Sequence, residues 1–192
     1  MKKVRVAVFI LVIFLSVMHL ETVHGGLKDS IVRLHIIANS DSKEDQAQKL
    51  QIRDFVLKNY GEVLSAENRT EALEEVFRNI PQIESDIRHT FKTDVKAELC
   101  EENFPTKEYD GITFPAGEYV ALKIKIGNAK GQNWWCVMYP PLCFSDLSTE
   151  TNRDKMKKVL SKEEYELVTS DSSKVVYKFK SVELWNKFKK LF

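Results

Sequence analysis

The stretch Tyr119–Tyr139, YVALKIKIGNAKGQNWWCVMY, decides the fold class of this 192-residue chain. Its first part, Tyr119–Ile126, ends in alternating apolar and lysine side chains, a pattern typical of a β-strand with one buried face. Gly127–Gly131 then predicts a turn, and the aromatic run Trp134–Tyr139 predicts a second strand. We expect the second strand to pair back antiparallel with the first, so the sequence predicts an antiparallel sheet.

Upstream of this sheet the sequence predicts one strand followed by helices. Ile31–Ala38, IVRLHIIA, is dense in β-branched residues and predicts a buried or half-buried strand. The polar residues after it contain capping boxes, beginning at Asp41 or at Ser42, which predict a helix over about 43–64. A second helix is expected to begin at 68–70, and Pro81 is expected in the first turn of a third, because proline disrupts helix interiors.

Downstream elements complete the expected fold class. The sequence predicts a strand at 95–99, a loop or hairpin at 104–118, helical structure within 148–169, a late strand near 175–180 and an amphipathic helix at 184–192. The expected class is α+β: an antiparallel sheet with an inserted helical segment and a C-terminal helix, after an N-terminal signal peptide.

The N-terminal segment has the layout of a Sec signal peptide. A basic start precedes the uncharged run Val6–Leu20, and the small residues Gly25 and Gly26 follow. The uncharged run has 15 residues, whereas a membrane-spanning helix needs about 20. We expect residues 1–26 to be a signal peptide cleaved after Gly25, with an uncleaved N-terminal membrane anchor as the alternative. Residues 27–192 are then expected to form a single extracytoplasmic α+β domain.

Composition and spacing exclude several function classes. Without residues 1–26 the chain has 26 Lys and Arg against 27 Asp and Glu, so it lacks the basic excess of nucleic-acid-binding proteins. The cysteines Cys100, Cys136 and Cys143 are spaced 36 and 7 residues apart, which matches no zinc-ligand pattern. We therefore expect no nucleic acid, no small-molecule substrate, no metal and no cofactor.

Two prolines, Pro140 and Pro141, stand between Cys136 and Cys143 and end regular strand pairing. If the chain reverses tightly at Tyr139-Pro140, with a cis peptide bond there, Cys136 faces Cys143 across a hairpin at a separation that suits a disulfide. If the prolines instead stay extended, the two sulfurs lie too far apart.

A cysteine nucleophile is the alternative role for these thiols. Such a nucleophile needs a base, and only His35 and His89 remain once residues 1–26 are removed. No motif joins either histidine to Cys136. If one of these cysteines were nevertheless a nucleophile, the alternative function would be an extracytoplasmic Cys-dependent hydrolase acting on cell wall or peptide.

Two segments resemble the stage II sporulation protein R family: RLHIIANSDSKEDQAQKLQIRD (Arg33–Asp54) and FPTKEYDGITFPAGEYVALKIKIGNAKGQNWWCVMYPPLCFSD (Phe104–Asp146). The resemblance makes 27–146 the family core and 147–192 a C-terminal extension. It implies a non-catalytic signalling protein of endospore formation, exported from the forespore into the space between the two membranes that separate it from the mother cell. There it would activate a membrane-embedded aspartic protease that removes the pro-sequence of sigma-E.

The polar turn after the first strand and the aromatic strand before the prolines are the expected contact surface, because tryptophan and tyrosine are favoured interface anchors. On a strand, Trp135 and Tyr139 share one face and Trp134 lies on the other. The candidate partner-binding residues are His35, Asn39, Asp41, Asp45, Arg53, Trp134, Trp135 and Tyr139.

Plainer interpretations of the same residues remain open. The acids of the polar turn can serve as helix caps, and helices can cover the tryptophans. The basic and aromatic stripe at 184–192 suits either a core-packing helix or a membrane-surface helix.

Overall fold

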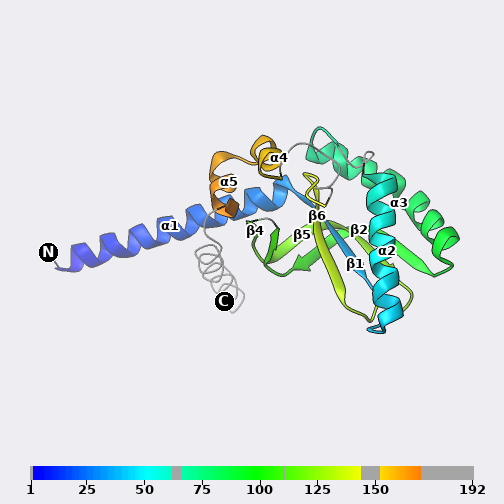
Figure 1. Cartoon of the computed structure of the whole chain (residues 1–192). Helices are drawn as coiled ribbons and strands as arrows, with labels where there is room; N and C mark the ends of the chain where they lie inside the picture. The colour runs from blue at the N-terminus through cyan, green and yellow to red at the C-terminus, as the bar shows by residue number, and fades with distance from the viewer. Residues whose placement is uncertain (1, 62–65, 110, 144–151, 170–192) are drawn as a thin grey trace.

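The computed structural model describes residues 2–61, 66–109, 111–143 and 152–169. A sheet lies at the centre, with two long helices against one side and two short helices beside the end of the first helix (Figure 1). The α+β prediction is confirmed. In chain order the elements are α1 (Lys2–Ser30), β1 (Val32–Ile37), α2 (Lys43–Tyr60), α3 (Arg69–Phe91), β2 (Val95–Phe104), β3 (Lys107–Tyr109), β4 (Ile112–Phe114), β5 (Gly117–Ile126), β6 (Asn133–Tyr139), α4 (Asn152–Val159) and α5 (Lys162–Thr169).

The main sheet is mixed, with strand order β2-β5-β1-β6, and not wholly antiparallel as predicted. Strand β1 lies between β5 and β6, parallel to β5 and antiparallel to β6. Leu34 therefore has Leu122 on one side and Cys136 on the other. The expected hairpin of β5 with β6 is wrong, because all six residues of β1 are buried. A strand covered on both faces belongs inside a sheet.

Helices α2 and α3 cover one face of this sheet, which we call the helix face. Beneath them the side chains of Leu34 and Ile36 pack against Ile52 and Val56 of α2 and against α3, and all four are 0% exposed. Burial of each such side chain stabilises the fold by roughly 1.5–3 kcal/mol.

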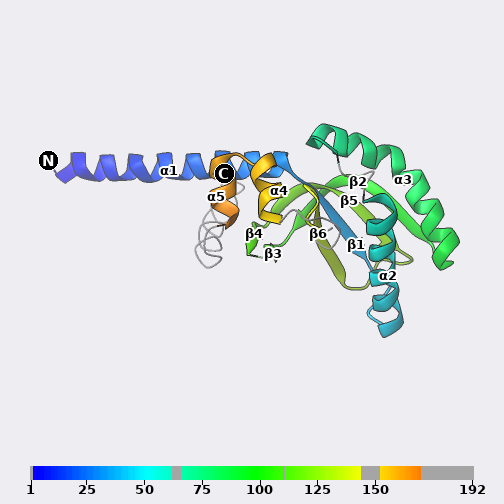
Figure 2. The same ribbon diagram turned by 45° about the horizontal axis from the view of Figure 1, so that its top comes forward.

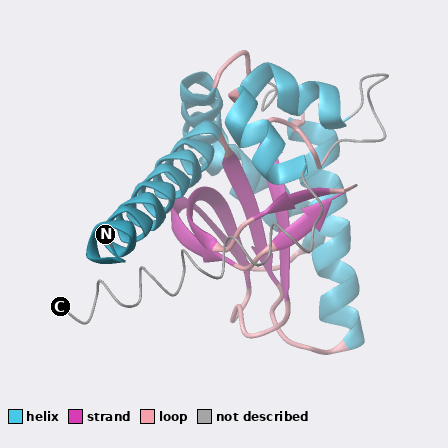
Figure 3. Cartoon of the chain, turned by 90° about the vertical axis from the view of Figure 1, so that its left-hand side faces the viewer, coloured by secondary structure: helices cyan, strands magenta, loops and turns pink. Residues whose placement is uncertain are grey.

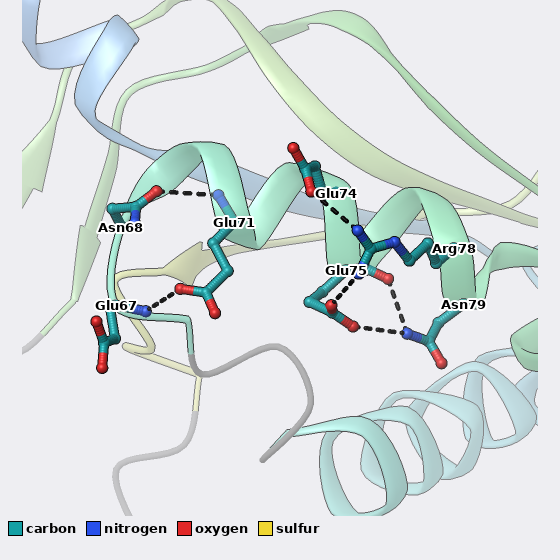
Figure 4. Close-up of polar contacts among 7 residues, drawn as sticks. All are labelled: Glu67, Asn68, Glu71, Glu74, Glu75, Arg78 and Asn79. Carbon is teal, nitrogen blue, oxygen red and sulfur yellow. Dashed lines mark hydrogen bonds and ion pairs between the residues drawn. The ribbon is translucent and has the colours of Figure 1, made fainter.

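Local polar contacts fix where α3 begins. The Asn68 side chain accepts a hydrogen bond from the backbone N–H of Glu71 (3.0 Å), and the Glu71 carboxylate accepts one from the N–H of Glu67 (2.9 Å; Figure 4). One turn further, Arg78 bridges Glu74 and Glu75 at the solvent side. The bonds to Asn68 and Glu71 satisfy backbone donors that a helix start leaves free.

Helix α3 runs through Pro81, so the predicted break there is wrong. Proline removes the hydrogen bond to the carbonyl four residues earlier, which is that of Phe77. Both residues lie on the exposed side of α3, where Phe77 is 69% exposed, so this carbonyl faces water. The backbone hydrogen bonds on the buried side of α3 are kept.

A second apolar cluster lies on the opposite face of the sheet, which we call the open face. The end of α1, the β3–β4 hairpin, α4 and α5 cover part of it, so that helices flank the strands on both sides (Figure 3). The predicted hairpin within 104–118 and the predicted helical structure within 148–169 are both confirmed. Fully buried members include Leu27, Phe114, Tyr119 and Val137.

The end of β6 reverses as the proline argument predicts. The Tyr139-Pro140 peptide is cis, and the N–H groups of Leu142 and Cys143 both reach the carbonyl of Val137 at 3.3 Å. The sulfurs of Cys136 and Cys143 are 2.07 Å apart, as in a disulfide.

The expected face of Tyr139 is wrong. The β1–β6 register shifts between Val32 and Arg33, because Val32 pairs with Tyr139 while Arg33 pairs with Val137. This irregularity inserts one residue into β6 and turns Tyr139 toward the helix face, where it joins the core.

Helix α1 continues through the predicted cleavage site to Ser30. Most of it projects away from the sheet (Figure 2), and the apolar side chains of Val4–Leu15 are 48–67% exposed. Its last turn belongs to the core, since Leu27 is 0% exposed. Among the described residues, no helix has the length and hydropathy that a membrane span requires. The predicted late strand and the C-terminal helix at 184–192 lie outside the described residues.

Candidate functional site

The polar turn after β1 is held by its own side chains. Asp45 accepts hydrogen bonds from the Asn39 amide (2.8 Å) and the Ser40 hydroxyl (2.5 Å), and these bonds lower the pKa of the Asp45 carboxyl. Ser42 is the N-cap of α2 and accepts from the N–H of Asp45 (3.1 Å). Asp41 makes none of these bonds and is exposed. Helix capping in this turn therefore belongs to Ser42, and Asp41 is free for another role.

This turn is fastened to the segment that joins β5 to β6. The Asn39 side chain accepts from the N–H of Asn128 (2.9 Å), and its carbonyl accepts from the N–H of Lys130 (3.1 Å). Two glycines make the approach feasible: a Cβ at Gly127 would lie 2.4 Å from Asn39 Oδ1, and one at Gly131 would lie 2.2 Å from the Ser40 carbonyl oxygen. Residues 39–42, the NSDS motif, and the glycine-rich turn 127–131 thus form one unit at the end of β1.

On the helix face, Arg53 and Trp134 contact each other beside this unit. The Arg53 guanidinium lies 5.3 Å from the centre of the Trp134 ring and also pairs with Asp54 at 2.7 Å. Close by, the buried Lys49 donates to the carbonyl of Gln132 (3.0 Å). Burial lowers the pKa of Lys49, and the charge of Asp41 partly offsets that effect.

On the open face, His35 is stacked on Trp135, with ring centres 3.6 Å apart. Its Nε2 donates to Asn133 Oδ1 (2.8 Å); its Nδ1 lies 3.9 Å from a Glu102 carboxylate oxygen and has no hydrogen bond among the described residues. Burial lowers the pKa of His35; Asn133 and Glu102 oppose this shift, and Lys123 adds to it. The lowered pKa favours the neutral form of the His35 imidazole. The side chain is buried, at 3% exposed.

Arg33 is the group whose role the sequence does not predict. Its guanidinium is 0% exposed and lies 4.4 Å from the centre of the Phe104 ring, with Phe114 and Tyr119 at 5.3 and 5.1 Å. The Tyr109 hydroxyl accepts a hydrogen bond from it (3.3 Å), while Nε and Nη1 have no acceptor among the described residues. Burial lowers the pKa of Arg33. The cation–π contacts with these rings supply part of the electrostatic stabilisation that a counter-ion would give Arg33. The only sequence signal was its position two residues before His35.

The structure brings most of the candidate residues together and leaves one apart. Around the C-terminal end of β1 lie His35, Asn39, Asp41, Asp45, Arg53, Trp134 and Trp135. Tyr139 is at the far end of β6, where its hydroxyl donates to the Glu67 carbonyl (3.3 Å). The two tryptophans serve opposite faces, as predicted.

The rest of the open face carries a ladder of charges that sequence reasoning missed. Lys125 pairs with Glu98 (2.5 Å), and Lys123 pairs with Glu102. Free Cys100 lies between these acids on β2, and burial raises the pKa of its thiol. Within the described ranges, no cluster of His, Cys, Asp and Glu is placed to hold a metal ion.

Fold and site define an α+β protein with a mixed sheet, a tied polar turn at one sheet end and an aromatic and charged surface beside it. The family model of stage II sporulation protein R matches residues 28–149. A curated relative, "Stage II sporulation protein R" from Bacillus subtilis (strain 168), is 37% identical over 164 residues, which cover 82% of this chain and 73% of the relative. The chain therefore belongs to the stage II sporulation protein R family. No solved structure matches it.

Proposed function

We propose that the protein is an exported signal of sporulation that activates the membrane-embedded aspartic protease processing pro-sigma-E in the mother cell. Family membership carries this proposal, because the match over residues 28–149 includes every strand of the main sheet and both helices on it. The family takes its name from sporulation and not from a catalysed reaction. The finer role rests on what that family membership implies.

We place the protein outside the forespore membrane, in the space between forespore and mother cell. The basic start, the apolar run and the small residues of 1–26 support export. The structure is compatible with cleavage after Gly25, since the buried part of α1 begins only at Leu27. A cut there leaves the core of the open face complete.

The proposed mechanism is a population shift in the receptor. An activator must bind the active state of its receptor better than the inactive state. Binding from outside would order the pair of subunits that a two-carboxylate protease needs. The tied turn from Asn39 to Asp45 is preorganised, so little conformational entropy would be lost when it binds. We expect contacts from exposed Asp41 and from the segment 134–143.

A non-catalytic role agrees with the state of the cysteines. A nucleophilic cysteine needs a thiolate and a base, and the Cys136 sulfur is at bonding distance from Cys143. His35 donates to Asn133 and stacks on Trp135, so neither cysteine of this pair is its partner.

Reconstitution tests the proposal. The sigma-E precursor and its membrane protease are produced in a non-sporulating host, with or without this chain, and cleavage of the precursor is followed by immunoblot. We expect processing only when the chain is present. Unchanged processing would sink the activator role.

A matched control separates export from binding. The double variant Phe9→Asp/Ile13→Asp places charges in the apolar run and should block export while leaving the core untouched, since both side chains are exposed. We expect it to accumulate in the cytoplasm without triggering processing. Full processing by this non-exported variant would contradict the proposed location.

A further inference from the structure

At one edge of the main sheet, that of β6, two outward carbonyl groups have partners within the protein. The Trp135 carbonyl accepts from the Tyr109 hydroxyl (3.0 Å), and the Val137 carbonyl accepts from the N–H groups of Leu142 and Cys143. Natural proteins block exposed strand edges in such ways, because unpaired backbone groups recruit other strands.

At the other edge, that of β2, side chains of α3 bond to backbone groups along the first half only. Arg88 donates to the Val95 carbonyl (2.5 Å), and Glu84 accepts from the N–H of Ala97 (2.6 Å). These two side chains come from α3 and pair with each other at 2.9 Å. The two hydrogen bonds show that Val95 and Ala97 direct these backbone groups away from β5.

The second half of the β2 edge is open. The β2–β5 register is continuous from Val95 to Phe104, so alternation also turns the N–H and C=O groups of Leu99, Glu101 and Asn103 outward. No side chain or backbone group of the described residues bonds to them. Glu101 and Asn103 are exposed, and Leu99 is half-buried. Six successive outward backbone groups therefore have no hydrogen-bond partner in the described part of the chain.

The negative charge beside this edge favours some binding partners over others. Glu101 and Glu118 are exposed acids of the same sheet end, and neither has an ion pair within the described chain. A second copy of this chain added edge to edge would bring like charges together, which destabilises strand pairing. An extended segment with lysine or arginine side chains would instead be attracted.

We infer that the β2 edge over Leu99–Asn103 binds an extended, basic segment of the partner protein, which adds to the sheet as a fifth strand. Main-chain hydrogen bonds would supply affinity, and the acids beside them would select a basic sequence. The open length suits a strand of roughly five residues at about 3.3 Å each. The inference rests on the proposed function, since it takes this segment to come from the outward-facing part of the membrane protease.

Amide hydrogen exchange tests it residue by residue. The exported full chain is mixed with the detergent-solubilised protease, and exchange is read with single-residue resolution. The amides of Leu99, Glu101 and Asn103 should exchange fast in the free protein and become protected in the complex. Those of Cys100 and Glu102 already belong to the β2–β5 ladder and should change little. Protection elsewhere, with these three amides still fast, would overturn the inference while leaving the proposed function intact.

A variant pair isolates the backbone contribution in the reconstituted processing assay. Glu101→Pro removes an outward N–H and places the ring on the edge, a position that edge strands tolerate. Glu101→Thr removes the same charge but keeps the N–H and strand preference. We expect processing to fall roughly tenfold or more with proline, and to fall only a few-fold with threonine. Equal processing by Glu101→Pro and wild type would overturn the inference.

Three further outcomes would count against the inference. If Glu101→Pro lowers the melting temperature, Glu101→Lys replaces it, and a wild-type rate from Glu101→Lys would contradict selection for a basic segment. Protection of the same three amides by raising the protein concentration alone would identify a second copy as the occupant, against the inference. Absence of any processing with wild type would remove the proposed function and this inference together.

Discussion

The two faces of the main sheet are built on different principles. On the helix face, Leu34 and Ile36 of β1 pack in one apolar cluster with side chains of α2 and α3. On the open face, the alternate residues of the same strand are Arg33 and His35, which are 0% and 3% exposed. Within the described chain, all buried side-chain nitrogen and oxygen atoms that lack partners belong to Arg33, His35 and Thr113, on this second side.

This difference separates stability from specificity within one strand. A dry apolar face stabilises the fold in proportion to its buried area. A buried guanidinium that, among the described residues, has no carboxylate partner costs free energy that cation–π contacts offset only in part. The open face also carries the half-buried charge ladder, and the half-open edge of β2 borders both faces. We therefore expect stability to depend chiefly on the helix face, and interactions with other molecules chiefly on the open face and the β2 edge.

The largest effect should come from neighbouring residues of β1 that point to opposite faces. Leu34→Ala leaves a cavity under α2 and α3 and should lower the free energy of unfolding by about 2–5 kcal/mol. Arg33→Met keeps much of the volume and removes a buried charge, so it should change stability by less than about 1 kcal/mol, in either direction. Chemical denaturation measures both. A loss at Arg33→Met as large as that at Leu34→Ala would break the comparison.

The cysteines give the next largest difference. Cys136 and Cys143 close a short loop at the helix face, so the double variant Cys136→Ser/Cys143→Ser should lose about 2–3 kcal/mol by the loop-entropy estimate. Cys100→Ser is the control, since Cys100 is free and half-buried on the open face. Its melting temperature should stay close to that of wild type. If the serine pair melts like wild type, the loop is held by other contacts.

A smaller effect should distinguish two residues of the polar turn. Asn39→Ala removes hydrogen bonds to Asp45 and from Asn128, and should cost about 1–2 kcal/mol. Asp41→Ala removes an exposed side chain that is not the cap, so its unfolding free energy should change by about 0.5 kcal/mol or less. Thermal melts of both variants, together with the processing assay, test whether Asp41 contacts the partner. Lost processing with an unchanged melt would place Asp41 in the partner contact.

The sequence predicts the local elements well, because their signals are local. The strands at β5 and β6, the reversal at Tyr139-Pro140 and the pairing of Cys136 with Cys143 all follow from residues close together in the chain. Strand order does not follow from neighbouring residues. β1 lies between β5 and β6 because it is the strand that is buried on both faces, and this depends on the whole sheet. Pro81 shows the same limit: whether a proline breaks a helix depends on which side of that helix meets water.

The candidate site divides in the same way. The NSDS motif is visible in sequence, but its bonds to the Gly127–Gly131 segment join residues 89 apart in the chain. The surroundings of His35 combine Glu102, Lys123 and Asn133 from three other strands, and periodicity cannot bring these together. The open half of the β2 edge was also beyond reach, because it is defined by what α3 fails to cover.

The smallest predicted effect is a pH dependence that originates on the open face. Burial lowers the pKa of His35 in the folded protein, where Glu102, Lys123 and Lys125 also act on it. Its contribution to stability is therefore complete above the unfolded value of about 6.5 and is lost as the pH falls from there toward the lower folded value.

Relative to His35→Gln, wild type should lose unfolding free energy between about pH 7 and 5, with a slope difference of at most about 1.4 kcal/mol per pH unit. The variant Leu34→Ala should keep the wild-type slope, because it alters only the opposite face. Parallel curves for wild type and His35→Gln would mean that Glu102 compensates the burial of this imidazole, and the two faces would then differ in packing but not in response to protons.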